Sequence, residues 1–225
     1  MNLSTPCSSR KILQLFVALT VLAPAAAVWA AEVELEVDAD TYIWVNQPNQ
    51  SHDSDDVQFE TDGTLWVGDN QGAQIVFLHF PEDQVPAAAE AGVVAASLKL
   101  AKSGYAMGNN TPVTVAVRLI LGPWTEQVTW NDGVQVGTTT YDQWQVDVNQ
   151  AVHTYDVTEL VQDVQEGGGP FHGIALVPVG NAPWSNVGYS PHESFGDPAL
   201  LVIETCSKVD VDEDGVAECD GDCDD

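Results

Sequence analysis

Positively charged residues are scarce in this sequence, since six lysines and arginines stand against 34 aspartates and glutamates among 225 residues. A surface this acidic repels polyanions, which excludes nucleic acids and anionic lipids as partners. Divalent cations, neutral glycans and basic partners remain compatible with it. The sequence also lacks the G-x-S-x-G, H-E-x-x-H, G-x-G-x-x-G and Walker motifs, and its five histidines have no metal-ligand spacing. We therefore expect a protein that is not an enzyme.

Long apolar runs are also missing, apart from ILQLFVALTVLAPAAAV behind Arg10 and Lys11. Val28 and Ala30 place small residues three and one positions before a predicted cleavage point, so we interpret residues 1–30 as a signal peptide. A membrane anchor is the alternative, but the run is short for a bilayer and is interrupted by Pro24. We expect a secreted or cell-surface protein with no transmembrane segment after cleavage.

Cysteine is rare, and Cys7 lies within the predicted signal peptide. Export makes disulfides possible for Cys206, Cys219 and Cys223. An odd number leaves at least one thiol free, joined to another chain, or without the partner that a longer chain would supply. The sequence does not decide whether Cys206 pairs with Cys219 or with Cys223.

Short β-type segments separated by Gly, Asn, Asp and Pro are abundant. In VTVAVRLIL, apolar residues fall on one face from Val113 to Leu121, which is typical of an antiparallel sheet with one buried side. Residues 156–165 have a helical pattern, with Asp156 or Thr158 as N-cap and Gly167 as the stop. We predict strands at 33–37, 41–45, 64–67, 74–80, 93–101, 111–121, 144–148, 173–179 and 198–204. This pattern favours an all-β fold, an antiparallel jelly-roll β-sandwich with one short helix over residues 31–205.

The composition changes abruptly in residues 206–225, which we interpret as an irregular acidic tail that binds calcium. Alternating aspartates before a glycine direct oxygens at one ion, as in EF-hand loops, but position twelve counted from Asp210 is Gly221 instead of glutamate. Residues 209–225 more closely resemble thrombospondin type-3 repeats and the D-x-D-x-D-G…D-C-D-D modules of bacterial surface proteins. A solvated, disordered tail is the alternative. The predicted calcium ligands are Asp210, Asp212, Asp214, Glu218, Asp220, Asp222 and Asp224.

The acidic pattern stops at Asp225 in the middle of a repeat. We interpret this as a chain that is a fragment of a longer protein, or as a tail that another protein completes. A second calcium could bind near Asp38 and Asp40 or in the cluster from Asp53 to Asp56, with a soluble loop as the alternative.

Four motifs together carry a family resemblance: DADTYI (38–43), TLWVGD (64–69), PWTEQVTWND (123–132) and YSPHESFGDPALLVI (189–203). In this order they resemble the DNRLRE-domain family, also described as carbohydrate-binding module family 96. The resemblance implies an extracellular jelly-roll sandwich that binds polysaccharide without catalysis, in one branch an anionic uronate polymer. Here an anion would meet only Lys99, Lys102, Arg118 and Lys208.

Two groups of residues are candidates for ligand contact. Aromatic residues in loops can stack on sugar rings, because no sheet requires them for packing. These are Trp184, Tyr105 and Phe195, and Trp66 and Trp44 are further candidates of the same kind. The residues of the family motifs could stack on or hydrogen-bond to sugars, but we expect them to pack on the sandwich and satisfy backbone groups. These are Asp40, Trp124, Glu126, Thr129, Trp130, Asn131 and Glu193.

The sequence thus predicts a non-catalytic polysaccharide-binding module with a calcium-binding tail, and an extracellular polysaccharide or cell-surface glycan as partner. Further modules or self-assembly are possible additional partners. One alternative is a structural or adhesive extracellular protein that calcium assembles or stiffens. Another is a polysaccharide-degrading enzyme, either a hydrolase that uses Glu126 with Glu193 or a calcium-assisted lyase. The glycan and the assembly state are not readable from the sequence.

Overall fold

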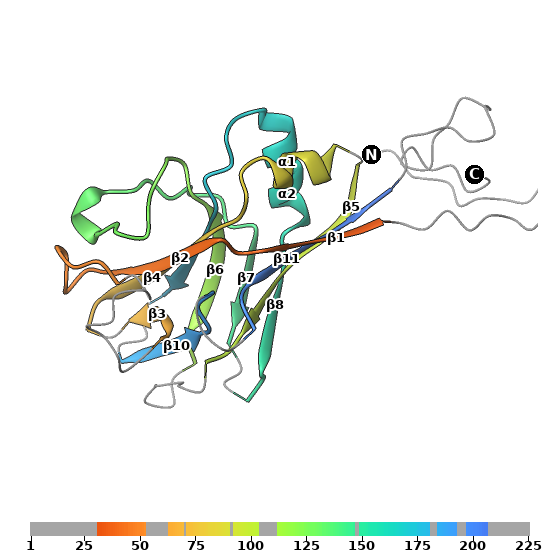
Figure 1. Ribbon diagram of the computed structural model, residues 1–225. Coiled ribbons are helices and arrows are strands. Elements are labelled where there is room, and N and C mark those ends of the chain that lie inside the picture. Colours follow the sequence, from red (N-terminus) through yellow and green to blue (C-terminus); the bar gives the residue numbers. More distant parts are fainter. Residues whose placement is uncertain are drawn as a thin grey trace, which may run out of the picture.

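The computed structural model describes residues 31–52, 63–69, 71–90, 92–103, 112–146, 149–180, 184–192 and 197–206. Within these ranges, β-strands form two antiparallel sheets that pack face to face (Figure 1). The predicted signal peptide and residues 207–225 of the predicted tail lie outside the described residues. No helix in the described ranges is long and apolar enough to cross a membrane.

The smaller sheet has four strands, and all of its pairings are antiparallel. In spatial order they are β1 (Ala31–Glu36), β11 (Leu200–Thr205), β5 (Val93–Ala101) and β8 (Val152–Asp156). β1 and β8 are therefore the edge strands of this sheet as described.

The larger sheet has seven strands, again with antiparallel pairings. In spatial order they are β10 (Ser185–Tyr189), β3 (Leu65–Asp69), β4 (Ala73–His79), β9 (Ile174–Val179), β6 (Thr114–Leu119) and β7 (Asp142–Gln145). The remaining strand, β2 (Ala39–Trp44), also pairs with β4. The chain crosses between the two sheets within residues 37–38, where β1 leads into β2.

The main hydrophobic core lies between the two sheets. Val76 and Leu78 of β4 face it from the larger sheet, and Leu98 of β5 and Leu201 of β11 face it from the smaller one. Two helices, α1 (Gln84–Ala89) and α2 (Thr158–Gly167), lie together at one end of the sandwich (Figure 1). They close that end with side chains that are fully buried, namely Val85, Ala89, Leu160 and Val161.

The outer face of the larger sheet carries a second apolar cluster. Phe77 of β4 and Ala175 of β9 alternate with the core-facing residues and point to this outer side, where both are completely buried. Residues 121–137, which include the 3₁₀ turn η2 (Trp130–Asp132), lie against them (Figure 1, green loop). This segment, hereafter the covering segment, contributes Val128 and the partly buried rings of Trp124 and Trp130.

The all-β prediction is confirmed, and each of the nine predicted strands overlaps an observed one. β5 has the predicted bounds. The structure adds β8, β10 and α1, which the sequence pattern did not reveal. β10 has the sequence SNVGY, in which Asn186 and Gly188 are residues typical of turns. β8 is short and half polar, so its alternation is weak.

Two local predictions are corrected by the structure. The helix begins at Thr158 with Val157 at the N-cap position, so neither Asp156 nor Thr158 is the N-cap. Leu121 is 56% exposed, although the alternation placed it on the buried face. The chain leaves the sheet just before Leu121, whose N–H donates to the carbonyl of Gln135 in the covering segment.

We predict that Leu98→Ala lowers the free energy of unfolding by about 2–5 kcal/mol, because a fully buried side chain leaves a cavity between the sheets. The matched control is Val94→Ala in the same strand, where the side chain is 55% exposed and the change should stay within about 0.5 kcal/mol. Urea denaturation followed by tryptophan fluorescence measures both. Equal losses for the two variants would contradict the assignment of β5 to the core.

Candidate functional site

The family-motif carboxylate Asp40 is completely buried and joins three parts of the chain. Its Oδ2 accepts a hydrogen bond of 2.8 Å from the backbone N–H of His192, and its own N–H donates to Glu126 Oε1 at 3.2 Å. His192 Nδ1 lies 3.4 Å from Asp40 Oδ2 and 3.9 Å from Glu126 Oε1. These contacts attach β2 to the covering segment and to the residues after β10. Glu193, the next motif residue, lies outside the described residues.

The two motif tryptophans pack on the larger sheet. The Trp124 ring lies 5.5 Å from that of Phe77, and its indole N–H donates to the carbonyl of His172 at 2.8 Å. Trp130 packs in the same outer cluster. In this structure the motif tryptophans therefore hold the covering segment in place.

The other motif residues fix the turn that contains η2. The backbone N–H and hydroxyl of Thr129 donate to Asp132 Oδ2 at 2.7 and 2.8 Å, and these two bonds hold the pKa of Asp132 below its ordinary value. Asn131 donates from Nδ2 to Asn49 Oδ1 at 2.6 Å and from its backbone N–H to the Pro48 carbonyl at 3.0 Å.

The predicted loop aromatics have different surroundings. Trp66 is 7% exposed, because it belongs to β3 and not to a loop, and so it offers no ring face to a ligand in this structure. Trp44 is half-buried in β2, with its ring 6.3 Å from that of His52. Trp184 is 49% exposed and directly precedes β10. Tyr105 and Phe195 lie outside the described residues.

His52 is a buried imidazole beside these aromatics. It stacks on Tyr42 with ring centroids 4.3 Å apart, and 8% of its surface is exposed. Burial disfavours the charged imidazolium and lowers the pKa of His52 from 6.5 to about 4. His52 is therefore a neutral packing residue at physiological pH.

The outward residues of the smaller sheet belong to neither apolar cluster, in contrast to Phe77 and Ala175 of the larger sheet. Because Leu98 and Leu100 of β5 face the core, the alternate residues of this strand point outward, and the pairing register carries the same alternation across all four strands. We call this surface the four-stranded face. Its outward residues are Glu32, Glu34 and Glu36 of β1, Leu200, Val202 and Glu204 of β11, Ala95, Ser97, Lys99 and Ala101 of β5, and Val152, Thr154 and Asp156 of β8.

A hollow of about 410 Å³ lies at one end of this face, with Trp144 of β7 in its lining. Trp144 pairs with Val115 at the edge of the larger sheet, so its ring points to the side where the smaller sheet lies, and it is 54% exposed. Ser97 and Thr154 contribute small, hydroxyl-bearing positions to the same hollow, and Glu204 contributes a carboxylate. We call it the Trp144 hollow.

Two further carboxylates of the Trp144 hollow are fixed by hydrogen bonds. Asp142 Oδ2 accepts from the N–H of Asp156 at 2.9 Å, and its Oδ1 accepts from the N–H of Gln143 at 2.7 Å. Asp156 Oδ1 accepts from the hydroxyl and the N–H of Thr158 at 2.7 and 3.0 Å, which lowers the pKa of Asp156. The hollow thus combines an aromatic ring with carboxylate acceptors whose orientation is fixed.

A second hollow of about 290 Å³ adjoins the first along the strands. It is lined by Lys99, Val152 and Leu200, each two residues along its strand from Ser97, Thr154 and Val202 of the Trp144 hollow. Glu36, Ala101, Asp197 and Pro198 complete its lining. We call it the Lys99 hollow.

The comparison with known families covers both sheets. The sequence profile of carbohydrate-binding module family 96 matches residues 31–205, from the first residue of β1 to the last residue of β11. The chain belongs to carbohydrate-binding module family 96. No curated protein matches this sequence. Both hollows of the four-stranded face lie within the matched residues of this family 96 domain.

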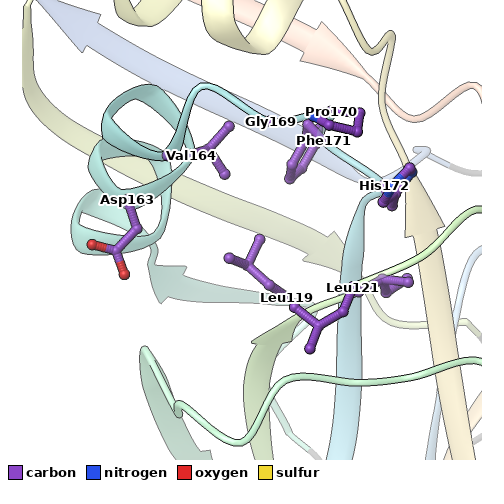
Figure 2. Close-up of a pocket in the computed structure, with 10 residues that line it drawn as sticks. Leu119, Leu121, Asp163, Val164, Gly169, Pro170, Phe171 and His172 are labelled. Atoms are coloured by element: carbon purple, nitrogen blue, oxygen red, sulfur yellow. The ribbon is translucent and has the colours of Figure 1, made fainter.

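A third hollow of the family 96 domain, of about 290 Å³, lies between the end of β6 and the turn after α2. Figure 2 shows Leu119 and Leu121 on one side of it and Val164 and Phe171 on the other. The phenyl ring in its lining, that of Phe171, is 1% exposed and so offers almost no face for stacking. Asp163 accepts a 2.8 Å bond from the hydroxyl of Tyr141. This hollow suits a sugar less well than the Trp144 hollow.

The described residues contain no group of three or more His, Cys, Asp or Glu side chains that could hold a metal ion. Near the predicted second calcium site, Asp38 Oδ1 lies 2.5 Å from His79 Nδ1, and Asp40 has the contacts given above. The cluster from Asp53 to Asp56 and the tail ligands from Asp210 to Asp224 lie outside the described residues.

Trp144 is the residue that sequence reasoning missed as a ligand candidate. It lies in the strand that the sequence predicts at 144–148, where an aromatic residue is expected to be buried. β7 is instead an edge strand, so the ring has no further strand of its own sheet beside it. The one available signal was the polar sequence around it, DQWQ, which is unusual for a fully buried strand.

We predict a pH dependence of stability from His52. Because the pKa of His52 is about 4 in the folded chain and 6.5 otherwise, the unfolded chain takes up the proton first as the pH falls. Above pH 6.5, His52 should therefore add no pH dependence to the free energy of unfolding. Between pH 6.5 and about 4, its contribution should lower the free energy of unfolding as the pH falls. His52→Gln should reduce this slope by up to about 1.36 kcal/mol per pH unit in urea denaturation across the window.

The control for this experiment is the region below pH 3.8, where Asp132 and Asp156, whose pKa values are lowered, lose their stabilising contribution. That loss should be the same in both proteins. Parallel stability curves for wild type and His52→Gln between pH 6.5 and about 4 would show that the imidazole can be charged in the folded state.

Proposed function

We propose that this chain is a non-catalytic polysaccharide-binding module whose ligand lies on the four-stranded face. The observation that carries the proposal is the unequal covering of the two sheets. Residues 121–137 pack on β2, β4 and β9 of the larger sheet, while the outward residues of the smaller sheet belong to neither apolar cluster and have the exposed ring of Trp144 beside them. Membership of a carbohydrate-binding module family supports a glycan as the class of ligand.

The chemistry of the Trp144 hollow supports the same ligand class. A sugar ring has an apolar C–H face and a rim of hydroxyls, so it matches an aromatic ring placed next to polar groups. Ser97 and Thr154 can donate or accept hydrogen bonds with these hydroxyls, and Asp156 and Glu204 can accept them. Asp142 and Asp156 are already held by backbone N–H groups, so little side-chain entropy is lost when they bind.

Trp184 is the competing candidate for ligand contact, because it too is exposed. It precedes β10, which is at the opposite end of the larger sheet from β7 in the strand order. The two tryptophans therefore belong to different surfaces, and the experiment below separates them.

Secretion and calcium binding by the tail are also part of the proposal. The apolar run behind Arg10 and Lys11 supports export, and the alternating aspartates from Asp210 onward support calcium binding. Without an ion these carboxylates repel one another, so calcium and ordering of the tail should be coupled.

We predict that Trp144→Ala weakens polysaccharide binding by at least about 30-fold, because loss of a central aromatic anchor typically costs about 2 kcal/mol. The mature chain, residues 31–225, is first screened on an array of neutral and acidic polysaccharides in millimolar calcium. The best ligand is then titrated calorimetrically into wild type and variant.

The matched control is Trp184→Ala, which removes a tryptophan of similar exposure and should leave the dissociation constant unchanged. If Trp184→Ala abolishes binding and Trp144→Ala does not, the ligand lies at the loop before β10. If the wild-type protein binds none of the glycans on the array, a carbohydrate-binding function is refuted.

We predict that the mature chain binds calcium and that Asp212→Asn/Asp214→Asn weakens this binding, because both substitutions replace charged ligands of the predicted loop with neutral ones. Isothermal titration with calcium measures the effect. The glycan dissociation constant of the same variant should be unchanged, since the tail follows β11 in the sequence and contributes none of the named glycan contacts. If the double variant still binds calcium as tightly as the wild type, the tail is not the calcium site.

A further inference from the structure

We infer that the four-stranded face selects an uncharged glycan chain that occupies both hollows, and that it discriminates against glycans that carry carboxylates or sulfates. This inference rests on the proposed function and specifies its ligand. It draws on the charge of the face and on the placement of the two hollows along β5 and β8.

The charge of the face is strongly negative. β1 presents a glutamate at each of its three outward positions, and all three are exposed. Asp142, Asp156 and Glu204 line the Trp144 hollow, and Asp197 lines the Lys99 hollow. A uronate or a sulfate bound here would lie close to several like charges, which disfavours it by electrostatic repulsion.

Lys99 is the one cation among the outward residues of the four-stranded face as described. It lies between Leu200 and Thr154 in the strand register and lines the second hollow together with Glu36 and Asp197. One ammonium group among seven carboxylates does not reverse the sign of the local potential. The ammonium group can instead donate hydrogen bonds to sugar hydroxyls, whereas the carboxylates of the Trp144 hollow accept them.

The placement of the hollows sets the minimum length of the ligand. Ser97 in the Trp144 hollow and Ala101 in the Lys99 hollow are four residues apart on β5, which is about 13 Å of extended strand. A ligand that fills both hollows must therefore be an oligomer that runs along the strands. The outward side chains of β5 are small at Ala95, Ser97 and Ala101, which leaves room for such a chain above the sheet.

The test compares one polysaccharide in two charge states. The probes are a neutral glucan or galactomannan that the array identifies and the same polymer with its primary hydroxyls oxidised to carboxylates. With the full mature chain at low ionic strength, the oxidised polymer should bind about tenfold more weakly or worse. The difference should shrink at high salt, because exposed charges are screened.

Glu36→Gln/Glu204→Gln removes one exposed charge from each hollow and should reduce the difference between the two polymers. The matched control is Glu90→Gln/Glu166→Gln, which removes two exposed charges from positions outside the four-stranded face and should leave the difference unchanged. Equal effects of both variants would show that net charge and not this face causes the discrimination, and would overturn the inference.

The outcomes separate the inference from the proposed function. Equal or tighter binding of the oxidised polymer, with Trp144 still required, would overturn the selectivity and leave glycan binding intact. A disaccharide that binds as tightly as a hexasaccharide of the same polymer would overturn the occupation of both hollows. Failure of both polymers to bind would refute the proposed function and this inference with it.

Discussion

The attachment of residues 121–137 to the larger sheet determines which surfaces of this domain remain available. Trp124 holds the segment through its contact with Phe77 and its hydrogen bond to the carbonyl of His172. The Asp40 and Glu126 contacts hold it from the side of β2. A two-sheet sandwich has two outer faces. Because residues 121–137 pack on the outer face of the larger sheet, a ligand that requires an extended flat surface would bind on the four-stranded face.

The strand sequences differ according to whether one or both sides of the strand are buried, and this explains why the fold class was predictable. β5 alternates Leu98 and Leu100 with Ser97 and Lys99, as a strand buried on one side must. β4 and β9 contain continuous apolar runs, because one side of each strand meets the core and the other meets the covering segment. β8 and β10 were not predicted. Each pairs with a strand that is distant in the sequence, and a local sequence pattern does not show such a pairing.

The candidate site was less predictable, because it depends on which strands lie at the edges. Trp66 and Trp144 both belong to short strands, yet one is 7% and the other 54% exposed. The difference follows from the positions of β3 inside the larger sheet and β7 at its edge. The motif carboxylate Asp40 is a similar case, since its partners Glu126 and His192 are 86 and 152 residues away in sequence. From the sequence, only the family resemblance of the motifs that contain these residues could indicate that they belong to one site.

The acidic composition has a structural cause on the four-stranded face that is independent of any ligand. β1 is an edge strand of the smaller sheet, and an exposed edge can pair with the edge of another molecule. Charged residues on such a strand oppose this pairing, because two copies would bring their glutamates together. Glu32, Glu34 and Glu36 therefore protect the edge against association. Since Glu36 also lines the Lys99 hollow, the same charges that keep the domain from pairing edge to edge set the potential that a bound glycan meets. Selectivity for uncharged sugars would then arise from a requirement of solubility, without residues dedicated to excluding anions.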